Sequence, residues 1–190
     1  MINICIFASG SGTNMERICE FFETRKDVSI SLELSNNNDA FVLERTKNRN
    51  IPSFVFNKTE LKETDIVLKR LLSVNADLIV LAGFLWLIPQ NILAHFPNKI
   101  INIHPALLPK FGGKGMYGMN VHKAVIESNE IESGITIHLV NEKYDDGEIL
   151  FQAKCEVELS DTPERLAEKI HQLEHEHFPK VIEQFLKRQI

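Results

Sequence analysis

The fold class is indicated by residues 2–14, which read INICIFASGSGTN. Residues 2–7 are apolar and rich in β-branched side chains, as in a buried strand. They end in a glycine-rich turn at residues 9–12, and apolar side chains then recur at helical spacing over residues 14–24. A strand that passes through such a turn into a helix is typical of the first unit of an α/β sheet.

The same alternation of strands and helices continues through the first half of the chain. Strands are expected at 28–34, 53–56, 77–82 and 99–103, and helices at 40–48, 64–74 and 90–95. This order implies parallel strands joined by right-handed crossovers.

The second half has a different pattern. Residues 107–119 form a glycine-rich loop, and residues 121–127 are expected to be helical. Strands at 135–140 and 148–158, joined through 141–147, predict a hairpin. A final helix starts at Ser160–Glu164 and runs towards Lys187, with a kink expected at Pro179. We therefore predict an α/β fold: an open, doubly wound, Rossmann-like and mostly parallel sheet with a C-terminal β excursion and a long terminal helix.

Composition limits the functions to be considered. The chain has 190 residues, 44% of them hydrophobic and 25% charged, with a net charge of −5. An acidic chain lacks the excess of Lys and Arg that nucleic acids and membrane surfaces require. Its three cysteines are widely spaced, and its first residues lack the basic flank of a secretory signal. We expect a cytoplasmic protein, a monomer or homodimer, with small-molecule substrates and neither nucleic acid nor membrane as a partner.

The turn after the first strand is a candidate phosphate site. In Gly10–Asn14, backbone N–H groups lie at the positive end of a helix and favour an anion. No Lys follows, so this is not a Walker A loop, and Met15 occupies the place of the third glycine of the dinucleotide fingerprint. Glu33 does lie about twenty residues further on, as the ribose-binding acid of that fingerprint would. The alternative is a tight turn that binds no ligand.

Asn102-Ile103-His104-Pro105 is the most informative stretch. Alternation along a strand places Asn102 and His104 on the same side, at the carboxyl end where open α/β sheets carry their sites. An amide beside an imidazole suits a developing oxyanion, because both groups donate hydrogen bonds and the imidazole also moves protons. A structural role for a histidine at a strand end is the alternative.

The turn Asp145-Asp146-Gly147 has two interpretations. Asp-Asp-Gly is ordinary turn chemistry. A carboxylate here could instead reach His104, orient the imidazole and favour its charged form.

Three further features also have competing interpretations. His171–His175 matches the H-x-x-E-H zinc motif, in which Glu174 would be the base, but a solvated polar helix face is the alternative. Gly112–Gly115 is either a mobile lid with one cation or a plain connection. Phe84–Ile88 is either core or an apolar wall for a flat ring.

Taken together, these motifs resemble one family over nearly the whole chain. In order, the sequence carries Ser-Gly-Ser-Gly-Thr-Asn at 9–14, Leu-Ala-Gly-Phe at 81–84, Asn-Ile-His-Pro at 102–105 before Leu-Leu-Pro, Asp-Asp-Gly at 145–147 and Glu-His-Glu-His-Phe-Pro at 174–179. This pattern resembles the folate-dependent phosphoribosylglycinamide formyltransferases. The resemblance implies 10-formyltetrahydrofolate as donor co-substrate, the amine of phosphoribosyl glycinamide as acceptor, and no metal.

The resemblance also implies roles for particular residues. The catalytic residues would be Asn102, His104 and Asp145, with His104 protonated and supported by Asp145. The acceptor would contact Gly12, Thr13, Asn14, His171 and Glu174. The pterin would contact Leu85, Trp86, Leu87, Ile88, Asn102, Asn141, Glu142, Lys143, Tyr144 and Asp145. One domain would span residues 1–190, with a phosphate- and acceptor-binding half at 1–100 and a catalytic and folate-binding half at 101–190.

Other functions remain open on the sequence. Trp86 stands where the family often has an Arg, which affects the expected contacts of the folate tail. A formyltetrahydrofolate hydrolase or methionyl-tRNA formyltransferase would share the Asn-x-His-Pro and Asp elements, although both normally carry an extra domain. A silent phosphosugar- or folate-binding module and a zinc hydrolase are alternatives from other classes.

Overall fold

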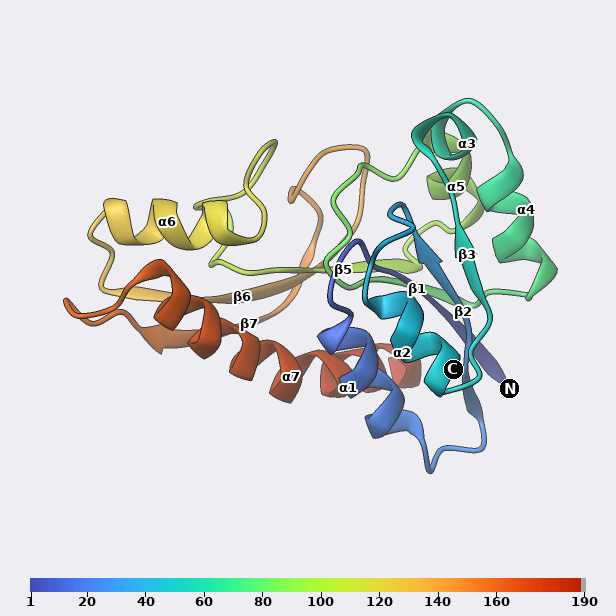
Figure 1. The fold of residues 1–190 in the computed structure, drawn as a ribbon, viewed down its shortest axis with the longest axis horizontal. Helices are drawn as coiled ribbons and strands as arrows, with labels where there is room; N and C mark the ends of the chain where they lie inside the picture. The colour runs from blue at the N-terminus through green and yellow to red at the C-terminus, as the bar shows by residue number, and fades with distance from the viewer. Residues whose placement is uncertain (189–190) are drawn as a thin grey trace. The chain divides into compact units, whose positions relative to one another are not determined.

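The computed structural model describes residues 1–188 (Figure 1). The chain forms two compact units, Met1–Asn102 and the part from Ile103 onward. Over the described residues, hydrogen bonding joins the strands in the order β3-β2-β1-β4-β5-β6-β7. The mostly parallel α/β sheet predicted from the sequence is confirmed.

The first unit alternates strands and helices. Its elements are β1 (Ile2–Phe7), α1 (Thr13–Phe22), β2 (Val28–Ser35), α2 (Val42–Asn48), β3 (Ser53–Val55), α3 (Lys58–Lys62), α4 (Ile66–Ser73), β4 (Leu78–Leu81), α5 (Gln90–His95) and β5 (Ile100–His104), which leads into the second unit. The neighbouring strands pair in parallel. Helices α1 and α2 cover one face and α3, α4 and α5 the other, as right-handed crossovers on either side of β1 require (Figure 1).

Strand register brings the ends of four strands to one edge of this unit. Phe7 at the end of β1 lies beside Leu34 of β2 and Leu81 of β4, and Leu81 in turn pairs with Asn102 of β5. The chain after each of these strands therefore leaves the sheet at the same edge, where open α/β sheets carry their ligands. The buried residues Ile4, Ile6 and Phe7 anchor the central strand in the core.

One helix was not predicted from the sequence. Residues 58–62 form α3, and the helix expected at 64–74 is shorter, spanning Ile66–Ser73. The Asn57 side chain accepts from the Glu60 N–H, and the Glu60 carboxylate accepts from the Asn57 N–H. This reciprocal capping box stabilises a helix that has too few residues to show a hydrophobic period.

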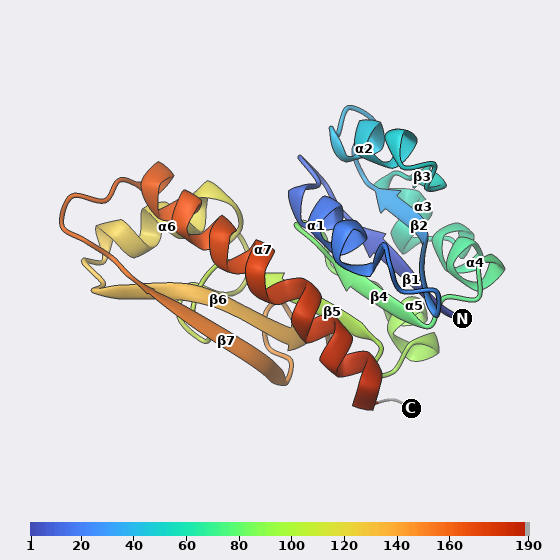
Figure 2. The same cartoon turned by 90° about the horizontal axis from the view of Figure 1, so that it is seen from below.

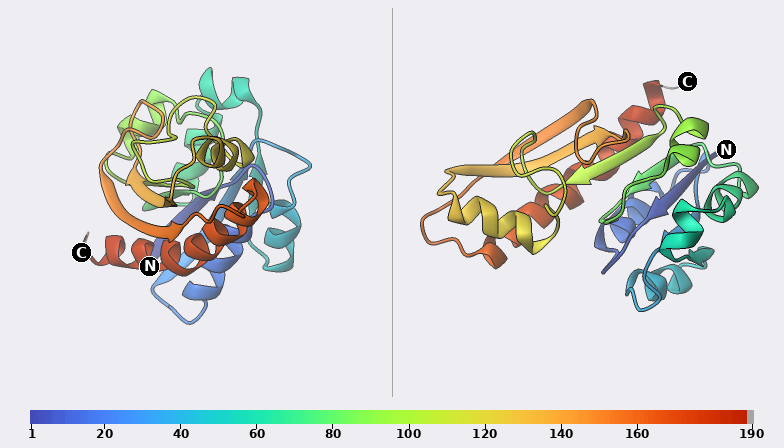
Figure 3. Two further views of the ribbon diagram at one scale, coloured as in Figure 1. Left: turned by 90° about the vertical axis from the view of Figure 1, so that its left-hand side faces the viewer. Right: turned by 90° about the horizontal axis from the view of Figure 1, so that it is seen from above.

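The second unit consists of a hairpin and two helices. They are α6 (Met119–Glu127), β6 (Glu132–Leu139), β7 (Ile149–Glu156) and α7 (Pro163–Arg188). The strands β6 and β7 are antiparallel. Figures 2 and 3 show α7 lying along both strands, with α6 beside it. The expected hairpin is confirmed, and α7 continues without interruption through Pro179.

Within residues 1–188, no helix is both long and apolar enough to cross a membrane.

Candidate active site

The second unit brings His104 and Asp145 together. His104 is the last residue of β5, and its Nδ1 lies 3.5 Å from Oδ2 of Asp145 in the loop after β6. The His104 Nε2 lies 2.8 Å from the carbonyl oxygen of Phe111, which can only accept, so this nitrogen carries a proton. Both side chains are buried, with 4% and 10% of their surface exposed. Geometry therefore supports the His–Asp pairing that spacing alone left open.

The Asp145 backbone is held in a conformation that few residues adopt. Its φ is 52°, in the left-handed region where Asp is tolerated better than most side chains. Two residues later, a Cβ on Gly147 would lie 1.7 Å from the carbonyl oxygen of Leu139. The glycine of the Asp-x-Gly motif is thus required by the close approach of two backbone segments, and this approach fixes the turn that presents Asp145.

The glycine-rich loop is part of the same arrangement. The Gly113 N–H donates to Asp145 Oδ2 over 2.9 Å, and a Cβ on Gly112 would lie 2.6 Å from a Leu108 methyl carbon and 3.3 Å from the Asp145 Cβ. Gly112–Gly115 was considered as a lid. Its first two residues, Gly112 and Gly113, therefore pack on the Asp145 side chain. The Lys114 side chain that follows them is exposed.

The chain between His104 and this loop is fixed by a buried polar group on β6. The Thr136 hydroxyl donates to the Ala106 carbonyl over 2.7 Å and accepts from the Leu108 N–H over 3.0 Å. Gln152 of β7 donates to the same hydroxyl and to the Leu108 carbonyl. Side chains of the hairpin thereby set the path of the backbone that follows the histidine.

His138 is a candidate site residue that the sequence analysis missed. It lies on β6, its side chain is 3% exposed, and its Nε2 lies 3.7 Å from Asp145 Oδ1. Asp145 is therefore flanked by two imidazoles, since His104 faces its other oxygen. The signal in the sequence was a histidine between Ile137 and Leu139 of a strand, seven residues before the acid.

Burial and charge act in opposite directions on this group. Burial lowers the pKa of His104 below its usual value, and the Asp145 carboxylate and the Phe111 carbonyl offset only part of this effect. Burial alone would raise the pKa of Asp145, but His138, His104 and the Gly113 N–H together hold it below its usual value. Burial therefore opposes the charged form of His104 in the resting protein, because removing the imidazole from water outweighs the attraction of one carboxylate.

Asn102 lies two residues before His104 on β5 and is half-buried. Their positions share one side of the strand, as alternation predicts.

The loop Gly10–Asn14 of the first unit joins β1 to α1. Gly12 precedes the helix with φ 72° and ψ 22°, and a Cβ at this position would lie 2.5 Å from a Val42 methyl carbon. Gly12 and Asn14 are buried and Thr13 is half-buried. The Glu16 N–H bonds to the Gly12 carbonyl and starts the helix. The N–H groups before it lie at the positive end of α1, as an anion site requires.

The segment Leu85–Ile88 follows β4 in the same unit. The Leu85 N–H donates to the Ser9 hydroxyl over 3.2 Å, which links this segment to the end of β1. The Trp86 ring packs edge-on against Phe56 and Phe84. Leu87 is half-buried and Ile88 is buried. Trp86 therefore extends an aromatic cluster, where an Arg would present a charge.

The other expected folate contacts lie in the loop before Asp145. Its first residue, Asn141, accepts from the Lys143 N–H and donates to the Asp146 carboxylate. Glu142, Lys143 and Tyr144 are exposed. The Asp146 side chain is 54% exposed, whereas that of Asp145 is 10% exposed, so the two acids of the motif have different surroundings.

The two expected acceptor contacts on α7 are one turn apart. His171 is exposed, and its ring stacks on that of His175 at 6.2 Å. Glu174 is buried. Among residues 1–188, no group of three His, Cys, Asp or Glu side chains is arranged to hold a metal ion. The motif H-x-x-E-H therefore has no third ligand in this part of the chain.

Glu33 does not occupy the position of a ribose-binding acid. It lies in β2 with no exposed surface, and neither carboxylate oxygen has a hydrogen-bond partner among the described residues. Burial raises the pKa of Glu33 to about 8. A buried acid cannot meet a ribose hydroxyl. The chain therefore departs from the dinucleotide fingerprint at Glu33 as well as at Met15.

The fold is that of one class of protein: the chain belongs to the formyl transferase family, whose model matches residues 2–182. It is 40% identical over 185 residues to the chloroplastic phosphoribosylglycinamide formyltransferase of Arabidopsis thaliana, covering 94% of this chain and 63% of the relative. It is 38% identical over 193 residues to the phosphoribosylglycinamide formyltransferase of Bacillus subtilis, covering 98% of this chain and 95% of that one.

Solved structures agree with these relatives. The crystal structure of phosphoribosylglycinamide formyltransferase from Bacillus halodurans matches with a TM-score of 0.89 and 31% identity, covering 99% of this chain and 97% of that one. The chain spans less of the plant relatives, at 63% and 62% of their lengths. The resemblance inferred from the sequence motifs is thus confirmed for the family.

Proposed function

We propose that this protein transfers the formyl group of 10-formyltetrahydrofolate to the amine of phosphoribosyl glycinamide, in the cytoplasm and as a step of purine biosynthesis. The observation that carries the proposal is the buried pair of His104 and Asp145 at the carboxyl end of β5, two residues after Asn102. The relatives named for this reaction support it, since two of them align over almost their whole length.

In the proposed reaction the acceptor amine attacks the formyl carbon, and a new C–N bond forms. The carbonyl oxygen becomes an oxyanion that accepts hydrogen bonds from the Asn102 amide and, once His104 has taken up a proton, from its imidazolium. The bond from the formyl carbon to the folate nitrogen then breaks. One proton must pass from the acceptor nitrogen to the folate nitrogen, and no net oxidation takes place.

His104 serves this proton transfer. Because burial lowers its pKa, the imidazole is neutral at pH 7 before the reaction and can accept the proton of the attacking amine. The Asp145 carboxylate at 3.5 Å then stabilises the imidazolium. The imidazolium gives the proton to the leaving nitrogen, directly or through water. The charged form of His104 is therefore assigned to the intermediate rather than to the resting protein.

The remaining assignments concern binding. Gly12, Thr13 and Asn14 are proposed to hold the phosphate of the acceptor, and His171 and Glu174 other groups of the same molecule. The backbone of Leu85–Ile88 and the loop Asn141–Asp145 are proposed to bind the pterin.

The test is formyl transfer followed spectroscopically with and without phosphoribosyl glycinamide. We expect release of tetrahydrofolate that depends on the acceptor and is lost in His104→Ala. Release without acceptor would instead identify a formyltetrahydrofolate hydrolase. Binding of both ligands without release would identify a silent binding module and refute the catalytic role of His104.

A further inference from the structure

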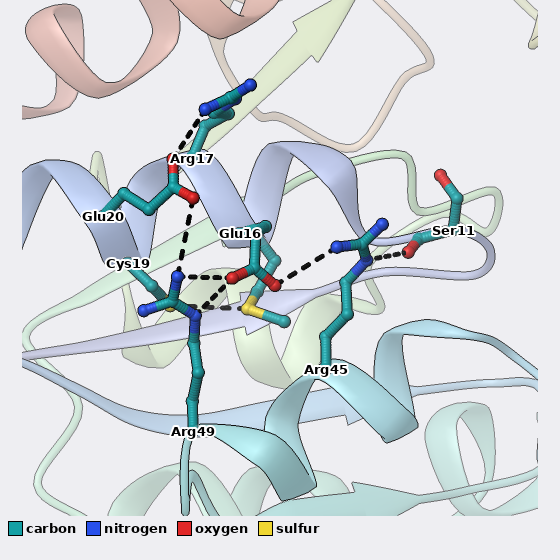
Figure 4. Close-up of polar contacts among 8 residues, drawn as sticks. Ser11, Glu16, Arg17, Cys19, Glu20, Arg45 and Arg49 are labelled. Carbon is teal, nitrogen blue, oxygen red and sulfur yellow. Dashed lines mark hydrogen bonds and ion pairs between the residues drawn. The ribbon is translucent and has the colours of Figure 1, made fainter.

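Arg45 of α2 contacts the loop that precedes α1 (Figure 4). Its Nε donates to the Ser11 carbonyl oxygen over 2.8 Å, and its Nη1 lies 3.3 Å from a carboxylate oxygen of Glu16 in the first turn of α1. Its guanidinium carbon lies 5.1 Å from the centre of the Phe41 ring. One planar group is thus held by a carbonyl, a carboxylate and an aromatic face.

The hydrogen bond from Arg45 to the Ser11 carbonyl determines the direction in which the Gly12 N–H points. The Ser11 carbonyl and the Gly12 N–H belong to one peptide unit, and in a trans peptide the two bonds point to opposite sides. A guanidinium that holds the carbonyl oxygen on one side therefore aims the Gly12 N–H at the other. Glycines adjoin Ser11 on both sides, so little else limits rotation of this peptide.

The loop is also pressed against the start of the helix that carries Arg45. The Val42 N–H donates to the Gly10 carbonyl over 3.1 Å, and a Cβ at position 12 would meet the Val42 side chain. Helix α2 therefore holds the loop at two places, through its first residue and, one turn later, through Arg45.

We propose that Arg45 is a positioning residue for the phosphate-binding loop, which it serves by fixing the Ser11 carbonyl so that the Gly12 N–H faces the phosphate of the substrate. The inference rests on the function proposed above. It assigns to Arg45 an effect on the affinity for a phosphorylated acceptor, exerted through the backbone and not through contact with the reacting atoms.

Arg49, the residue directly after the end of the same helix, provides a matched control. It lies one turn after Arg45 and pairs with the same Glu16 carboxylate, and its Nη2 lies 3.7 Å from Glu20 (Figure 4). Both of these partners belong to α1. Replacing Arg49 removes one positive charge and ion pairs with Glu16, as replacing Arg45 does, but leaves the bond to Ser11 in place.

The experiment compares Arg45→Met with Arg49→Met in the full chain, using two acceptors. These are phosphoribosyl glycinamide and the corresponding riboside without phosphate. In Arg45→Met we expect KM for the phosphorylated acceptor to rise at least about tenfold, the effect of losing one charge-assisted hydrogen bond. We expect kcat, KM for the folate, and kcat/KM for the riboside to stay within about twofold of wild type. Arg49→Met should leave all of these values within the same range.

Two results would overturn the inference. An equal loss of kcat/KM with both acceptors would show a general structural role, and an equal rise of KM in Arg49→Met would show an effect of charge alone. If Arg45→Met does not fold, Arg45→Lys is used in its place. The lysine ammonium keeps the positive charge but lacks the planar guanidinium, so this variant should still raise KM for the phosphorylated acceptor alone.

If the protein does not catalyse the proposed formyl transfer, the experiment gives a result different from either of these. Wild type would then transfer no formyl group to either acceptor, and binding of inorganic phosphate would become the measurement. Weaker phosphate binding by Arg45→Met than by Arg49→Met would support the positioning role, and equal binding would refute it.

Discussion

Replacing the buried acid of β2 should make the protein more stable, and increasingly so as the pH rises. Glu33 has no exposed surface and no hydrogen-bond partner for its carboxylate oxygens within residues 1–188, and burial raises its pKa to about 8 from the usual 4.5 of a glutamate. The unfolded chain therefore loses this proton near pH 4.5, whereas the folded protein keeps it until about pH 8.

The sign and size of the effect follow from this difference. Between these two pH values the folded state binds one proton more than the unfolded state, so the free energy of unfolding falls as pH rises. Each pKa unit corresponds to about 1.4 kcal/mol, so the total contribution is roughly 5 kcal/mol as an upper limit. In Glu33→Gln this loss is absent, because the amide has no proton to release and is similar in size.

Urea unfolding of both proteins between pH 5 and 8.5 provides the measurement. Trp86, the single tryptophan, lies in the same unit as Glu33 and reports its unfolding by fluorescence. We expect the variant to gain at least about 2 kcal/mol over wild type between pH 5 and pH 8, with an unchanged slope against urea. Titration of His104 and His122 affects both proteins alike and cancels in the difference. Glu44→Gln, an exposed change in the same unit, is the control.

A pH-independent difference between Glu33→Gln and wild type would refute this reasoning. It would mean that Glu33 is ionised in the folded protein and that its carboxylate is stabilised by contacts other than those described.

Three further predictions concern the candidate active site. Asn102→Ala and His104→Ala should each lower kcat at least about a hundredfold, the usual cost of losing an oxyanion donor, and folded variants with wild-type turnover would contradict their roles. Asp145→Asn should move the titration of the His104 imidazole, followed by NMR, to lower pH, because the carboxylate that raises its pKa is gone; a shift to higher pH would exclude the pairing. Gly147→Ala should lower the free energy of unfolding by roughly 1–3 kcal/mol, since its Cβ would collide with the Leu139 carbonyl, and calorimetry without a lower Tm would contradict this.

The sequence was sufficient for the features that repeat or that lie close together along the chain. Alternating apolar segments predicted the sheet, and Asn102 and His104 could be paired because they are two residues apart on one strand. Helix α3 was missed although its capping residues, Asn57 and Glu60, are visible in the sequence. A helix of five residues offers too few positions for a periodic pattern.

Features that depend on contacts between distant segments could not be predicted in the same way. The approach of His138 to Asp145 depends on how the hairpin turns, and the pKa of His104 depends on how deeply the imidazole is buried. The interpretation of Gly112–Gly115 as a lid did not anticipate the packing of Gly112 and Gly113 on Asp145. Packing of this kind is set by the whole second unit.

The bonds of the His–Asp pair to the glycine-rich loop have a consequence for how this protein can change over evolutionary time. His104 contacts a carbonyl of residue 111 and Asp145 contacts an amide of residue 113, so both partners are main-chain atoms. A substitution at Phe111 leaves its carbonyl in place, whereas one at Gly113, whose φ is 94°, would strain the backbone. An insertion or deletion between residues 104 and 111 moves both atoms at once. Variation in length between residues 104 and 111 is therefore a change that this part of the chain tolerates poorly.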